Sequence, residues 1–83
     1  GNYGVVEMGS DGDLDIRNYD PAKDIKFGVG SNTGAEDTLI LTSDGNLGLS
    51  NTGTNNPNNY SGWTTLTING SSGAELDFEK AGT

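Results

Sequence analysis

The chain has 83 residues, enough for one small domain, and it contains neither cysteine nor histidine. This composition excludes disulfides and thiolate metal sites, and it removes the most frequent general base and metal ligand. A formal net charge of −8 disfavours nucleic acid and anionic membranes as partners, because both are bound through basic patches. No apolar run is long enough to cross a bilayer, so we expect no membrane insertion.

Large apolar side chains are scarce but regularly placed. Leu, Ile, Val and Phe together make up 16 of the 83 residues. That share is just below the level of about 20% under which highly charged chains are usually disordered. These residues nevertheless alternate with polar ones, a pattern that a disordered chain has no reason to keep. We therefore expect strands with thin apolar faces that form a core shared between several chains.

The alternation predicts a series of short strands separated by turns rich in Gly, Asn, Asp and Ser. No window has a sustained apolar period of 3.6 residues, so we expect essentially no helix. The segment 30–34 is an expected loop, and the polar segment 51–62, which contains Pro57, is expected to be the least regular part. In chain order, the expected strands are 3–8, 13–17, 24–30, 38–41, 47–49, 63–69 and 74–79.

The stretch 38–49 contains the strongest turn signal. Its two alternating runs are separated by Ser43-Asp44-Gly45-Asn46, and Asp-Gly at such a place is typical of a β-hairpin. Gly45 can adopt the positive φ that the turn requires, and Asp44 can bond to its own backbone two residues on. We expect Asp44 and Gly45 to form this turn.

A short, degenerate repeat links the two ends of the chain. Residues 9–17 and 70–79 both read as a turn followed by an acid, Leu, Asp, an apolar residue and a charged residue. Two copies of one small unit favour an elongated array of hairpins over a closed globule. We expect residues 1–83 to be one segment of a longer chain, with sub-units at 1–34, 35–62 and 63–83.

Three acids are candidate metal ligands. Asp11, Asp13 and Asp15 have the spacing that opens a calcium-binding loop. An EF-hand also needs Gly at the sixth position and Glu at the twelfth, where this chain has Ile16 and Ala22. The three acids are better explained as a turn residue and a solvated strand face, so we expect no metal and no other cofactor.

Two further sets of residues suggest contact with carbohydrate. Glu75 and Asp77 share one face of an expected strand, and a glycosidase uses such a carboxylate pair. Other expected strands also carry outward acids, however, so we expect no catalytic residue and no enzymatic activity. Tyr60 and Trp63, beside the Asn-rich loop 55–59, are candidate glycan contacts if exposed. A buried Trp63 would instead seal one end of the shared core.

A family resemblance begins at residues 41–49, which read Leu-Thr-Ser-Asp-Gly-Asn-Leu-Gly-Leu and are followed by Asn56-Pro57. This arrangement resembles the I-T-S-D-G-N-V-G-I-G … N-P segment that recurs in bacteriophage tail fibre proteins. Residues 66–79 resemble what often follows that segment in the family. Ser50 departs from the pattern, because the family usually has glycine there.

The resemblance implies an all-β, elongated fibre segment in which short strands and hairpins of three chains intertwine, as in a triple β-helix or a β-prism. Its role would be structural: a shaft or shaft-to-tip segment of a phage tail or virion fibre that supports host attachment. It would lie on the virion, outside the cell, and contact its own copies, other virion or tail proteins and a host cell-surface glycan. The expected trimer core consists of Leu14, Ile16, Ile25, Phe27, Leu39, Leu41, Leu47, Leu49, Leu66, Ile68, Leu76 and Phe78.

Three alternatives stay open at the level of sequence. A glycan-binding module of a fibre tip would use Tyr60 and Trp63. A segment of a polysaccharide depolymerase would need a carboxylate pair facing a groove, for example between chains. The stalk of a bacterial surface adhesin would have nearly the same sequence character.

Overall fold

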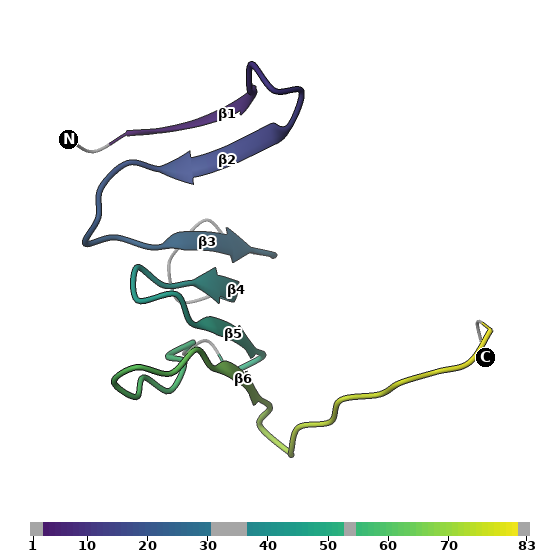
Figure 1. The fold of residues 1–83 in the computed structure, drawn as a ribbon. Coiled ribbons are helices and arrows are strands. Elements are labelled where there is room, and N and C mark those ends of the chain that lie inside the picture. Colours follow the sequence, from purple (N-terminus) through teal and green to yellow (C-terminus); the bar gives the residue numbers. More distant parts are fainter. Residues whose placement is uncertain (1–2, 31–36, 53–54, 82–83) are drawn as a thin grey trace.

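The computed structural model describes residues 3–30, 37–52 and 55–81. Within these ranges the chain forms six β-strands and no helix, so the prediction of an all-β protein is confirmed. The strands belong to a two-stranded and a four-stranded sheet (Figure 1). Apart from Gly30, the expected loop at 30–34 lies outside the described residues.

The N-terminal sheet is an antiparallel hairpin of β1 (Gly4–Met8) and β2 (Leu14–Asn18). Gly12 lies in the turn with a φ of +92°, a conformation that glycine adopts without a steric cost. The carboxylate of Asp11 accepts a hydrogen bond from the N–H of Asp13 at 3.0 Å. The Gly-Ser-Asp-Gly sequence is therefore accounted for by the local chemistry of the turn.

The second sheet has the spatial order β3-β4-β5-β6. From β3 to β5 neighbouring strands are antiparallel, whereas β5 and β6 are parallel. Parallel neighbours cannot be joined by a tight turn, so the chain returns through a long connection, residues 51–65. The strands are β3 (Ile25–Gly28), β4 (Asp37–Leu41), β5 (Leu47–Ser50) and β6 (Leu66–Asn69).

A tight turn joins β4 to β5. The N–H of Gly45 donates to the carbonyl oxygen of Thr42, and the N–H of Thr42 donates to that of Asn46, each at 2.9 Å. With Gly45 at a φ of +86°, this is a type I turn followed by a glycine bulge, and it contains Asp44. The side chain that supports the turn is Thr42, whose Oγ1 accepts the N–H of Asn46 at 3.1 Å.

One face of the four-stranded sheet is apolar from edge to edge. Paired residues of neighbouring strands point to the same side, so the register places eight apolar side chains in two rows across the sheet. We call them the apolar rows. The first consists of Ile25, Leu41, Leu47 and Leu66, and the second of Phe27, Leu39, Leu49 and Ile68.

The opposite face is covered by the chain itself. Ile40 is 5% exposed there, and Pro57 of the connection is buried as well. Beside it, a Cβ on Gly48 would lie 2.6 Å from Cγ of Pro57, so glycine is what lets the connection approach β5. Asn55 fastens the connection, because its Nδ2 donates to the carbonyl oxygens of Thr38 and Gly48, each at 3.0 Å.

The chain exposes much more surface than a compact protein of its size. Its accessible surface is 6479 Å² and its Cα radius of gyration is 15.0 Å. A compact monomer of this mass would have about 4,700 Å² of surface and a radius of gyration of about 12 Å. The sequence-based expectation of a thin, incomplete core therefore agrees with the dimensions of the single chain.

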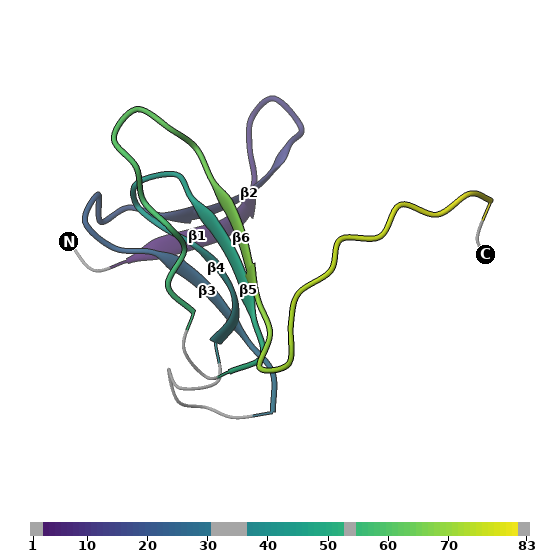
Figure 2. The same ribbon diagram turned by 90° about the horizontal axis from the view of Figure 1, so that it is seen from below.

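The strand expected at 74–79 is absent from the structure, so that prediction is wrong for the single chain. After the turn at 70–73 the chain runs as an extended segment away from both sheets (Figure 1). In Figure 2 this segment leaves β6 on the side away from the described part of the connection. A strand requires a hydrogen-bonded neighbour, and no described strand pairs with the segment. The strand expected at 63–69 is also shorter, since β6 begins at Leu66.

Gly48→Ala should lower the free energy of unfolding by about 1–3 kcal/mol, because the added methyl group would collide with the ring of Pro57. Thermal unfolding of the protein, followed by circular dichroism, measures the loss. Ser61→Ala, at an exposed position of the same connection, is the matched control and should change stability by less than about 0.5 kcal/mol. Equal melting temperatures for the two variants would mean that the connection does not rest on β5.

Candidate functional site

The apolar rows are open to solvent. In the middle of the sheet Leu41, Leu47 and Leu49 are 41%, 36% and 38% exposed, and at its edges Phe27 and Leu66 are 46% and 52% exposed. Scattered exposed leucines need no explanation, but an apolar patch that crosses four strands usually marks an interaction site. This face is the main candidate surface for assembly.

The two-stranded sheet has the same character. Its register places Val6 opposite Ile16 and Met8 opposite Leu14, so these four side chains share one face, and all four are exposed. Leu14 and Ile16 were predicted to be core residues, whereas Val6 and Met8 were not. In the run 3–8 the apolar residues Val5 and Val6 are adjacent, so the sequence pattern does not show which of them lies on the apolar face.

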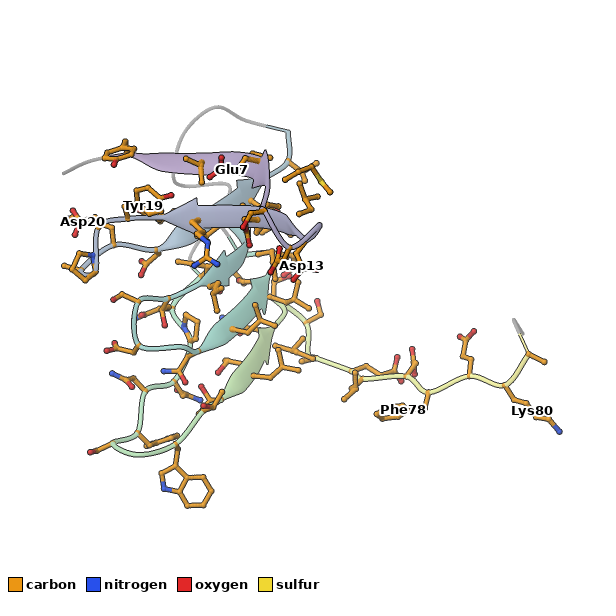
Figure 3. The ribbon with its side chains drawn as sticks, turned by 45° about the horizontal axis from the view of Figure 1, so that its top comes forward. Glu7, Asp13, Tyr19, Asp20, Phe78 and Lys80 are labelled. Carbon is orange, nitrogen blue, oxygen red and sulfur yellow. The ribbon has the colours of Figure 1, made fainter. Side chains whose placement is uncertain are left out.

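The C-terminal segment carries the last two predicted core residues. Leu76 and Phe78 are 60% and 89% exposed, and they alternate with the acids Glu75 and Asp77. Figure 3 shows Phe78 far from the side chains of the two sheets. The segment thus has the pattern and the extended course of a strand without a partner, and its carboxylate pair lies on that same exposed stretch.

The three candidate metal ligands form local contacts of a turn and a strand. Asp11 bonds to the backbone of Asp13, and Asp15 forms an exposed ion pair with Arg17 at 3.3 Å. In the described part of the chain no group of three acidic side chains is arranged to hold a metal ion. These acids are therefore assigned to the turn and to the solvated surface.

Tyr60 and Trp63 lie where the β4–β5 turn meets the β5–β6 connection. The N–H of Trp63 donates to the carbonyl oxygen of Tyr60 at 2.9 Å, and Gly62 has the φ of +80° that this turn requires. Both rings are exposed, Tyr60 by 58% and Trp63 by 73%. With Asp44 and Asn59 they line an open pocket of about 530 Å³, which we call the aromatic corner. In the single chain Trp63 does not seal a core.

Asn46 links the two segments that form the aromatic corner, the β4–β5 turn and the β5–β6 connection. Its side chain is 1% exposed. Its Oδ1 accepts the N–H of Thr65 at 2.8 Å, and its Nδ2 donates to Oδ1 of Asn59 at 3.1 Å. Asn59 in turn donates from Nδ2 to Oδ2 of Asp44 at 3.2 Å. The chain of amides ties the turn to the connection, so the corner is built before any ligand arrives.

Sequence reasoning did not identify the residues that close the covered face. Asn46 was interpreted as part of a turn, Asn55 as part of an irregular loop, and Ile40 was left out of the core. Two signals were available. Leu39-Ile40-Leu41 is apolar on both faces, which is typical of a strand covered on both sides. Gly48 between two leucines indicates the close approach of another segment.

No family model, curated protein or solved structure matches this chain. Within the described ranges the chain has no helix of the length and apolarity needed to span a membrane. The interpretation of function therefore depends on the uncovered faces, the aromatic corner and the residues that carry the family resemblance.

Asn46→Ala should destabilise the protein by about 1–3 kcal/mol, because it leaves the part-buried N–H of Thr65 without its acceptor. Thermal or denaturant unfolding of the protein measures the difference from wild type. Asn56→Ala, the same substitution at an exposed position of the connection, is expected to be nearly neutral. Comparable losses in both variants would show that the amide chain does not hold the corner.

Proposed function

We propose that this chain is a structural segment of a phage tail or virion fibre, acting as a homotrimeric shaft or shaft-to-tip segment that supports host attachment. The observation that carries the proposal is the sheet with one covered and one open face. A connection of the chain itself covers Ile40 and Gly48, whereas on the other face five of the eight side chains in the apolar rows are 36% to 52% exposed and lack a full cover. Copies of the same chain supply it.

The geometry of the apolar rows suits such an assembly. A four-stranded sheet is about 14 Å wide, so three copies turned towards one axis enclose a narrow prism lined by the rows. Five of the side chains in the rows are 36% to 52% exposed, and each of these gains on the order of 1 kcal/mol when it is covered. The number of three chains rests on the resemblance of residues 41–49 to tail fibre segments.

The C-terminal segment completes the interface. It leaves the sheet on the side away from the connection (Figure 2), and Leu76 and Phe78 alternate with acids as in a half-buried strand. The strands β3 and β6 are the edges of the sheet, and an edge offers unpaired N–H and C=O groups. In the trimer the segment pairs with such an edge of a neighbouring copy, so the chains intertwine.

The function of the assembled segment is mechanical. Acids, amides and hydroxyls on the outer surface keep the rod solvated, and the net charge of −8 on each chain opposes lateral aggregation. A depolymerase would require the Glu75 and Asp77 carboxylates to face a groove between chains. An adhesin stalk would share the same architecture, and the attached domains would distinguish it from a phage fibre.

Sedimentation velocity of the protein should give three chains per particle, and Leu49→Glu should abolish that assembly. A carboxylate at the centre of the apolar rows would be buried without a partner, which costs several kcal/mol in each of the three copies. Ser61→Glu adds the same charge at an exposed position of the connection and should leave three chains per particle. A stable, folded single chain in the wild type would contradict the shared core.

Phe78→Ser should lower the melting temperature of the assembly, with a loss of about 2–4 kcal/mol per chain, because the side chain becomes buried only when copies associate. The matched control is Glu79→Ser, which changes the next residue along the segment and faces the opposite side. If the side chain of Phe78 stays in solvent in the assembly, Phe78→Ser and Glu79→Ser should have the same melting temperature. That result would contradict the burial of Phe78 between copies.

A further inference from the structure

The aromatic corner has the composition of a binding site and takes no part in the apolar rows. Its pocket is lined by six side chains: Asp44, Asn59, Tyr60, Ser61, Trp63 and Thr64. None of them belongs to either of the apolar rows. Two large exposed rings next to several hydroxyl, amide and carboxylate groups form a site with both an apolar and a polar part.

The polar groups of the corner are held in place yet keep capacity for a ligand. Asn59 uses one N–H on Asp44 and one lone pair on Asn46. An amide has two N–H groups and an acceptor oxygen with two lone pairs, so one donor and one acceptor of Asn59 remain. In the described structure the bond from Asn59 reaches Oδ2 of Asp44, which leaves Oδ1 to accept from a ligand. A pre-positioned site loses little entropy when it binds.

We propose that the aromatic corner binds a neutral saccharide. The indole of Trp63 and the phenol ring of Tyr60 offer flat apolar surfaces for the C–H face of a pyranose ring. The carboxylate of Asp44 accepts from the hydroxyl groups at its edge, and the amide of Asn59 accepts from them or donates to them. No lysine or arginine lines the pocket, and the chain carries a net charge of −8, so acidic sugars are repelled.

This inference extends beyond the structural role and does not depend on the number of chains in the fibre. A shaft needs solvated side chains on its outside, but it does not need an exposed tryptophan next to a fixed carboxylate and amide. A saccharide site gives a role to the exposed ring of Trp63 and to the amide of Asn59, which the buried side chain of Asn46 holds in place.

Fluorescence titration of the assembled protein tests the proposal. Trp63 is the only tryptophan of the 83 residues, so its emission reports directly on the corner. The probes are the methyl glycosides of glucose, galactose, mannose and N-acetylglucosamine and their neutral trisaccharides. Glucuronic acid and N-acetylneuraminic acid serve as anionic comparators. At least one neutral sugar should give a saturable blue shift and protect the indole from quenching by acrylamide.

Calorimetric titration of variants with that sugar assigns the site. Trp63→Ala should weaken binding by about tenfold or more, and Trp63→Phe, which keeps an aromatic face, should weaken it less. Asp44→Asn removes the charged acceptor and should weaken binding several-fold. Asp20→Asn, the same change in a turn of the N-terminal half, is the control and should bind like wild type.

Several results would overturn the saccharide site. These are no saturable response to any neutral sugar, a response confined to the acidic sugars, or undiminished binding by Trp63→Ala. Sedimentation velocity of each variant is recorded alongside, so that a loss of binding in particles of unchanged size is separated from a loss of assembly. A failure of the sugar titration in intact trimers would overturn the saccharide site and leave the structural role standing.

Discussion

The chain covers one face of its four-stranded sheet with its own β5–β6 connection and leaves the apolar rows on the other face open. This constraint follows from the number of apolar residues, because a chain with so few cannot build two apolar layers of its own. The available residues are placed instead in two rows on one side of the sheet. In the assembly that we propose, association of copies does what internal packing does in a larger domain, and folding and assembly become one process.

The covered face shows how little apolar surface is needed when backbone and amide groups pack closely. Gly48 lets the β5–β6 connection lie against β5, and the amide of Asn55 bonds to two strand carbonyls at once. Asn46 ties the turn to the connection, because its Oδ1 accepts the N–H of Thr65 and its Nδ2 donates to Oδ1 of Asn59. Hydrogen bonds and close backbone approach thus replace a second layer of aliphatic side chains, and the outer surface stays free for polar residues and for the exposed rings of the aromatic corner.

The sequence predicted the local features of this fold well. Alternation of side chains is a property of neighbouring residues, so the strands, the Asp44-Gly45 turn and all eight members of the apolar rows were identified from it. Pairing is different, because it joins residues that lie far apart along the chain. The parallel neighbours β5 and β6, the unpaired segment 74–79 and the meeting of Asp44 with Asn59 depend on the path of the connection, which no local pattern specifies.

Gly48 also controls the alignment of the sheet. Along β5, Leu47 and Leu49 point to the open face, whereas Gly48 and Ser50 point under the connection. A slip of β5 by one residue would exchange the two sets and drive a leucine into the space that Pro57 and Ile40 leave only for a hydrogen atom. Gly48 therefore disfavours the shifted register, a constraint that matters in a sheet built from short strands of similar sequence.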